Sequence, residues 1–178
     1  MKRADSGLLK APTRDAPEIL KSFMKTYISS STLFYIERNK NVNFIIVDAK
    51  KRADADGAPP GIDEYWVNAD PKFQSIDSPS FRHDLNVHEQ RLYGLSYNTD
   101  DATCTFASLP DRKIKVINDG SAPPKAMTVI DGKEAQLSKV WMQLKNRFLG
   151  PPRITSIVFF GKLEDGGGNV EETIEVSF

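Results

Sequence analysis

Apolar and polar residues alternate along most of this chain in short runs. The clearest example is residues 33–49, where two apolar, β-branched and aromatic runs flank a polar centre at residues 37–41. This pattern predicts a β-hairpin, because Asn39 and Asn41 tolerate the left-handed backbone conformations of a turn. The second run, residues 42–48, is almost continuously apolar. We therefore expect it in the middle of a sheet or beneath a helix, covered on both faces.

Further short runs predict a series of strands after this hairpin. The expected strands cover residues 64–67, 95–98, 103–108, 113–117, 125–130, 134–146, 154–162 and 170–178. The apolar spacing in residues 134–146 fits a helix as well as a strand. We choose a strand, because the turn signal Asp131-Gly132 comes directly before it and β-structure surrounds it.

Two segments have a helical rather than an alternating pattern. Residues 15–18, Asp-Ala-Pro-Glu, resemble a capping box, and the apolar residues after them recur at helical spacing. They predict an amphipathic N-terminal helix over residues 16–28, whose apolar stripe packs on the sheet or enters a groove on another protein. Apolar residues spaced by four and seven between Phe81 and Leu92 predict a short internal helix that ends near Gly94.

The number of strands sets the expected fold class. Roughly nine or ten strands are too many for a simple open sheet in a chain of 178 residues. We expect a mainly β fold, a β-sandwich or a partly open β-barrel, with the N-terminal helix and one short internal helix. Residues 1–32 are expected to form a basic arm that carries the amphipathic helix, and residues 33–178 a single β-rich domain.

The zero net charge of the chain hides a gradient. Residues 1–52 hold 11 Lys or Arg against 5 Asp or Glu, whereas residues 53–178 hold 13 against 19. A basic arm on an acidic body suits docking to an acidic partner, while a solvated tail with incidental charge is the simpler interpretation. The candidate partner-binding residues are Lys2, Arg3, Lys10, Arg14, Lys21 and Lys25.

The composition argues against several classes of protein. No apolar run approaches the roughly 18 residues of a membrane helix, and the first ten residues lack the apolar core of a signal peptide. We therefore expect a cytoplasmic protein, with Cys104 as a buried thiol. We predict no metal or cofactor site, because His83 and His88, five residues apart on the expected helix, would lie about 140° from one another around its axis.

The polar centre of the hairpin is the best candidate for a small-ligand site. We expect Glu37, Arg38 and Lys40 to lie near Trp66 and Tyr93. Arg38 would anchor an anion, and the two aromatic rings would provide stacking surfaces. Open ends of β-barrels and sandwiches often bind ligands, although a structural use of the same residues is the other interpretation.

Several short motifs of this chain occur in one known family. They are Phe34-Tyr35-Ile36-Glu37-Arg38-Asn39-Lys40-Asn41, Tyr65-Trp66-Val67, Leu92-Tyr93-Gly94, Ile130-Asp131-Gly132-Lys133-Glu134-Ala135-Gln136-Leu137, and Gly161 with Glu172-Thr173-Ile174. From Leu33 to Phe178 the chain resembles DUF4833, a family of small β-rich domains of unknown function found in bacterial, often exported, proteins and in protists. The resemblance implies a β-rich fold and brings no known activity. This chain differs in lacking an export signal and in adding the helix at residues 16–28.

The function that we expect is non-enzymatic. The chain has no nucleophile paired with a base, no metal cluster and no glycine-rich nucleotide loop, so we expect a structural or interaction protein. It would be a subunit of a larger intracellular assembly, docked through its basic arm to protein partners; a cytoskeletal or ciliary complex is a more specific version.

Two other functions are weaker alternatives. A small-ligand binding β-module is the first. An uncharacterised enzyme is the second, with Asp84, His88 and Glu89 as the best candidates for acid–base chemistry, although nothing in their spacing singles them out. Nucleic-acid binding is not expected, because the basic residues lack interleaved aromatic residues and the acidic body repels phosphate.

Overall fold

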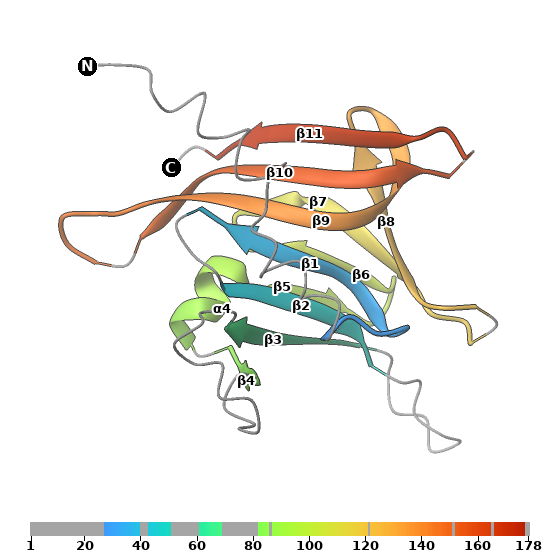
Figure 1. Ribbon diagram of the computed structural model, residues 1–178, viewed down its shortest axis with the longest axis horizontal. Coiled ribbons are helices and arrows are strands. Elements are labelled where there is room, and N and C mark those ends of the chain that lie inside the picture. The colour runs from blue at the N-terminus through green and yellow to red at the C-terminus, as the bar shows by residue number, and fades with distance from the viewer. Residues whose placement is uncertain are drawn as a thin grey trace.

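The computed structural model describes residues 27–39, 43–50, 61–68, 82–85, 87–120, 122–150, 152–164 and 166–176, with the backbone alone at residues 43, 68, 82–84, 88 and 89. This part of the chain contains eleven strands and one short helix (Figure 1). The strands are β1 (Thr32–Arg38), β2 (Asn43–Ala49), β3 (Ile62–Asn68), β4 (Arg82–Asp84), β5 (Leu95–Asn98), β6 (Thr103–Phe106), β7 (Leu109–Ile117), β8 (Lys125–Ile130), β9 (Lys133–Lys145), β10 (Arg153–Leu163) and β11 (Asn169–Glu175). The helix is α4 (Val87–Tyr93). The prediction of a mainly β fold is confirmed.

The sheet is organised around β9. One edge of β9 pairs along its length with β10, which pairs in turn with β11. The other edge is shared, because the first residues of β9 pair with β8 and residues 139–142 pair in parallel with β1. Two branches lead away from this edge, β1-β2-β3-β4 and β8-β7-β6-β5. They curl toward one another, and the sheet forms a nearly closed barrel (Figure 1).

One hydrophobic core fills the space between the branches. Ile36 and Trp66 enter it from one branch and Ile114 from the other, while Val140 and Phe159 enter it from β9 and β10. These side chains share one face of the curled sheet, because successive residues of a strand point to opposite faces. The interior of the barrel is therefore packed with side chains.

The strand β2 is buried on both faces, as its apolar run predicts. Its four central residues, 44–47, have no exposed surface. Ile45 and Val47 point into the core, and the other two point to the outer face of the sheet. The outer-face cluster consists of Phe44, Ile46, Tyr65 and Val67, with Tyr27 and Tyr35 packed against it. The predicted helix over residues 16–28 lies outside the described residues except at its end, where Tyr27 is helical.

The segment with the ambiguous pattern is a strand, as predicted. Asp131 and Gly132 have φ angles of 52° and 73°, which is the left-handed conformation of a tight hairpin turn, and β9 follows. The pairing with β10 shifts in register near Ser138, at a β-bulge. Because of this bulge, Leu137 and Val140 lie three residues apart and yet both face the core. The bulge explains why the apolar spacing also fits a helix.

The internal helix begins later than the sequence pattern predicts. Residues 82–84 form β4, in which His83 pairs with Trp66 of β3, and the helix covers residues 87–93. The expectation that His83 and His88 share one helix is therefore wrong. The physical reason is that pairing with β3 satisfies backbone hydrogen bonds of residues 82–84, and local periodicity carries no information about such tertiary pairing.

Gly94 ends the helix, as predicted. Its N–H donates a hydrogen bond to the carbonyl oxygen of Gln90, with an N···O distance of 3.0 Å. A Cβ atom at this position would lie 2.3 Å from the same oxygen, so only glycine allows the chain to turn this closely into β5.

Candidate functional site

Three of the five predicted ligand-binding residues meet at one end of the barrel. Arg38 is the last residue of β1, Trp66 lies on β3 and Tyr93 is the last residue of α4. The guanidinium carbon of Arg38 lies 4.1 Å from the Trp66 ring centroid and 4.9 Å from the Tyr93 ring centroid. Its Nη1 donates to the Tyr93 hydroxyl at 2.6 Å. The two rings pack edge to face, with their centroids 5.6 Å apart.

This arrangement leaves little of either aromatic ring exposed. Trp66 and Tyr93 are buried, and the Arg38 guanidinium packs against both rings. A desolvated cation–π contact of this kind stabilises by about 2 kcal/mol. A ligand that stacked on either ring would have to displace Arg38. The three side chains thus cover one another, and a ligand-binding role for this cluster stays a prediction.

The other two predicted residues are not part of this cluster. Glu37 points to the opposite face of β1, where its carboxylate lies 3.6 Å from the Lys139 ammonium. Both side chains are nearly buried, and the Lys139 ammonium also lies 4.5 Å from the Phe160 ring centroid. Burial, with a smaller contribution from the negative charge of Glu37, raises the pKa of Tyr35 above its ordinary value. Lys40 lies outside the described residues.

A shallow pocket of about 340 Å³ lies beside Glu37 on the same outer face. Its lining consists of Tyr35, Ser138, Lys139, Phe160, Gly161, Asn169, Val170 and Glu171. These residues come from β1, β9, β10 and β11, which are far apart in sequence. Sequence reasoning missed this pocket because it depends on the strand order, in which β9 is the neighbour of both β1 and β10.

A second carboxylate, that of Glu64, forms a hydrogen bond that links the two branches of the sheet. It lies on the core face of β3, and its Oε1 accepts the backbone N–H of Leu95, the first residue of β5, at 2.8 Å. Burial raises the pKa of Glu64 to about 7, with a smaller contribution from Asp63; the hydrogen bond from Leu95 acts in the opposite direction. Burial is also the main cause that raises the pKa of the nearby Cys104 thiol to about 12, so this thiol stays protonated and unreactive.

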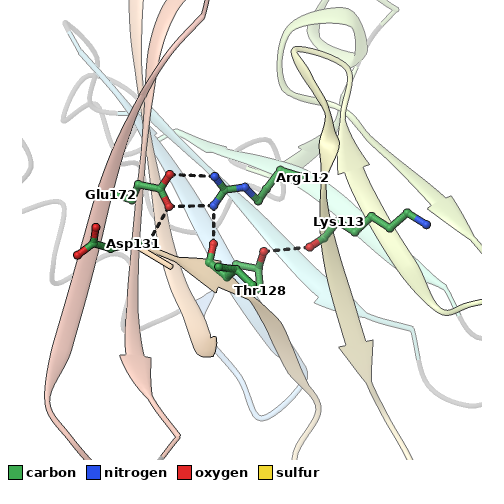
Figure 2. Close-up of polar contacts among 6 residues, drawn as sticks. Arg112, Lys113, Thr128, Asp131 and Glu172 are labelled. Carbon is green, nitrogen blue, oxygen red and sulfur yellow. Dashed lines mark hydrogen bonds and ion pairs between the residues drawn. The ribbon is translucent and has the colours of Figure 1, made fainter. Parts of the chain in front are cut away.

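A third carboxylate, Glu172, links β11 to β7 and to the β8–β9 turn, as Figure 2 shows. Arg112 donates to both carboxylate oxygens, at 2.9 and 2.8 Å, and also to the carbonyl oxygen of Val129. The backbone N–H of Asp131 donates to the same carboxylate at 2.7 Å. The hydrogen bonds from Arg112 lower the pKa of Glu172 and raise that of Arg112.

The loop between β9 and β10 carries the most exposed apolar side chains of the described residues. Phe148 is 101% exposed and Leu149 is 78% exposed. Exposed cations flank them, with Arg147 in the loop and Lys145 and Arg153 opposite one another at its base. The hairpin projects from the end of the barrel, at the left of Figure 1. We call residues 145–153 the β9–β10 tip. Sequence reasoning missed it, although a Phe-Leu pair between cations and before Gly-Pro-Pro was a usable signal.

The structure describes less of the remaining predicted site residues. The six basic residues of the arm, 2 to 25, lie outside the described residues. Asp84 lies on β4, and His88 and Glu89 lie on α4, with only their backbone described. Where the structure is described, no group of three or more His, Cys, Asp or Glu side chains is arranged to bind a metal ion. In the same residues, no helix is long and apolar enough to cross a membrane.

Comparison with known proteins gives one match. Residues 34–173, most of the chain, match the family described as a domain of unknown function (DUF4833). The resemblance found in the short motifs is thereby confirmed. No curated protein and no solved structure matches the chain.

Proposed function

The chain belongs to the DUF4833 family, and since that family carries no known activity, we propose from the molecule's own surface that the protein is a non-enzymatic interaction protein. It acts as a subunit of a larger intracellular assembly. The observation that carries this proposal is the β9–β10 tip, on which Phe148 is fully exposed and Leu149 is 78% exposed. Large apolar side chains exposed together on a projecting element are typical of surfaces that bind another macromolecule.

The interior of the barrel supports the same proposal. It is filled with core side chains, and Arg38, Trp66 and Tyr93 pack against one another at one end of it. A barrel that binds a small molecule inside usually keeps a cavity of several hundred cubic ångströms open at its mouth. The filled interior therefore favours binding through the outer surface.

The charge distribution indicates an acidic partner. The tip carries Lys145, Arg147 and Arg153, and the sequence of residues 1–32 is basic as well. Both segments would be attracted to an acidic surface, whereas the rest of residues 53–178 has an excess of acidic residues and would be repelled. The single buried thiol, Cys104, fits a reducing compartment, so we place the assembly in the cytoplasm, with a cytoskeletal or ciliary complex as the narrower version.

The test is the native size of the protein in gently lysed cells, with the tip intact and altered. We expect the wild-type protein to elute far above monomer size and to fall toward monomer size in high salt. The variant Phe148→Ser/Leu149→Ser should elute near monomer size at low salt. Val129→Ser is the matched control, because Val129 is an exposed apolar residue of β8 that pairs with the first residues of β9, away from the tip. A wild-type protein that elutes as a monomer at low salt would refute the proposal.

A small-ligand function is the second candidate, and the outer pocket favours it. The pocket combines two aromatic rings, Tyr35 and Phe160, with the cation Lys139 and the carboxylate Glu171. Its volume of about 340 Å³ lies at the lower end of the range for ligand sites. A ligand at a hundred times its dissociation constant should stabilise the fold by about 2.7 kcal/mol. A thermal-shift screen of metabolites in which no compound raises the Tm would count against this function.

A further inference from the structure

We propose that the β9–β10 tip docks on the surface of an anionic lipid membrane. This inference rests on the proposed interaction function, and it names the partner that the tip binds. The tip would lie in the interface of one leaflet, with its apolar residues among the lipid chains and its cations among the headgroups. No part of the barrel would enter the membrane.

The geometry of the tip matches the layers of a membrane surface. Lys145 and Arg153 are cross-strand neighbours at the base of the loop, and Arg147 lies between them and the apolar pair. Phe148 is three residues beyond Lys145 and follows Arg147 directly, so the apolar pair lies farther along the loop than the two cations at its base. An amphipathic helix at a membrane surface buries its apolar face about 5–10 Å into the boundary between headgroups and acyl chains. Cations at headgroup level and apolar side chains below them thus fit this hairpin without rearrangement.

The size of the apolar surface favours a membrane over a protein groove. One Phe and one Leu side chain together offer roughly 350 Å², whereas a stable protein interface buries about 800 Å² on each partner. Binding to a membrane needs less apolar area, because the insertion of a small apolar group and the attraction of cations to anionic headgroups both contribute to the binding free energy. The tip is also convex, since it is the end of a hairpin that projects from the barrel (Figure 1).

The acidic body restricts how the protein can approach. Glu171 and Glu175 are exposed on β11, the edge strand next to β10, and an anionic surface would repel them. The hairpin lets its cations reach the surface first. Binding should therefore require anionic lipid and weaken with salt, because charges at a surface are screened beyond about 8 Å at physiological ionic strength.

The experiment is flotation of the full-length protein with vesicles. Vesicles of phosphatidylcholine and phosphatidylserine should carry the protein, and vesicles of phosphatidylcholine alone should not. Phe148→Ser/Leu149→Ser should weaken binding at least tenfold, and Lys145→Glu/Arg147→Glu should abolish it. Val129→Ser, the control on β8, should bind as the wild type does. No binding to the anionic vesicles overturns the inference.

A fluorescent variant separates insertion from simple adsorption of the basic arm. In Phe148→Trp the new indole is exposed, while Trp66 and Trp141 are already buried and should not change. Its emission should shift to the blue with phosphatidylserine vesicles, and lipids brominated on their chains should quench it. Binding without a blue shift, or binding that Phe148→Ser/Leu149→Ser leaves intact, would mean that the arm adsorbs and that the tip does not insert; either result overturns the inference.

The result also distinguishes this inference from the proposed function. If vesicles fail to bind, but a large detergent-resistant complex in the lysate still depends on Phe148 and Leu149, the partner is an acidic protein. The membrane inference then falls and the interaction function stands. If neither vesicles nor a tip-dependent complex is found, both fall.

Discussion

Glu64 and Glu172 have the same structural role in two different parts of the sheet. Each is a carboxylate on the core face of a strand, and each accepts a backbone N–H from another part of the sheet, at 2.8 Å from Leu95 and 2.7 Å from Asp131. Each therefore joins strands that are not neighbours in the backbone ladder. Glu64 joins β3 to β5, and Glu172 joins β11 to the β8–β9 turn and, through Arg112, to β7.

The two carboxylates differ in their charge partners. Glu172 receives both Nη groups of Arg112, which stabilise its ionised form and lower its pKa. Within the described residues no cation accompanies Glu64, and burial raises its pKa to about 7. Two carboxylates with the same hydrogen-bonding role therefore make the stability of the fold depend on pH in opposite directions, because only one of them has an arginine beside it. Folding is helped at Glu172 by ionisation and at Glu64 by protonation.

The largest expected effect comes from Glu64→Gln. The amide keeps an acceptor for Leu95 but carries no charge at any pH. In the wild type, Glu64 ionises near pH 4.5 in the unfolded chain and near pH 7 in the folded chain. The stability that protonated Glu64 contributes is therefore complete below pH 4.5 and is lost as the pH rises through 7. The variant should therefore be more stable than the wild type by about 3 kcal/mol at pH 8 and equal to it at pH 4, as measured by urea denaturation.

The control for this prediction is Glu134→Gln, which changes an exposed carboxylate of β9. Its effect on the free energy of unfolding should be small, because the side chain is exposed. An equal difference in the free energy of unfolding between Glu64→Gln and the wild type at pH 4 and pH 8 would contradict the prediction. It would mean that Glu64 has the same pKa in the folded and unfolded states.

Gly94→Ala tests the donor side of the same link. The added Cβ would lie 2.3 Å from the carbonyl oxygen of Gln90, so the end of α4 must shift and carry the N–H of Leu95 with it. We expect a loss of about 2 kcal/mol in the free energy of unfolding. The control is Gly61→Ala, whose Cβ would meet only Lys50, at an ordinary 3.5 Å, and which should change stability by less than about 0.5 kcal/mol. Equal losses in the two variants would contradict the account.

The smallest effect is expected from Glu172→Gln, because Arg112 and Glu172 are each about a quarter exposed and can be rehydrated. We expect a loss of about 1 kcal/mol at pH 7. A lowered pKa contributes stability above the ordinary value of 4.5, which is lost as the pH falls through the folded pKa. The deficit of the variant should therefore shrink below about pH 4. Arg112→Lys, which keeps the charge without the two-pronged contact, should lose less than Glu172→Gln does at pH 7.

Local patterns in the sequence predicted most of the strands. The run at residues 44–47 is buried on both faces, and Asp131-Gly132 forms the tight turn that its composition demands. The prediction was wrong where pairing overrode periodicity, at residues 82–84, which form β4. It was ambiguous where a bulge near Ser138 broke the alternation of β9. Both cases have one cause, since a tertiary pairing partner changes the meaning of a local pattern.

The candidate sites depended even more on three-dimensional neighbours. The hairpin composition led to Arg38, and the structure places it against Trp66 and Tyr93, but Glu37 points away from them because neighbouring residues of a strand face opposite sides. The outer pocket and the two carboxylate links join residues more than thirty positions apart. No local spacing carries that information.

The sequence by itself determined that this is a β-rich protein of the DUF4833 family, because strand propensity, turn chemistry and short motifs are local properties. Only the tertiary structure decided which polar residues face one another across the sheet. It alone decided that Glu172 meets Arg112 while Glu64 meets a bare backbone N–H, and that Phe148 stands in water. Those features follow from strand order and register, which arise when the whole core is buried together.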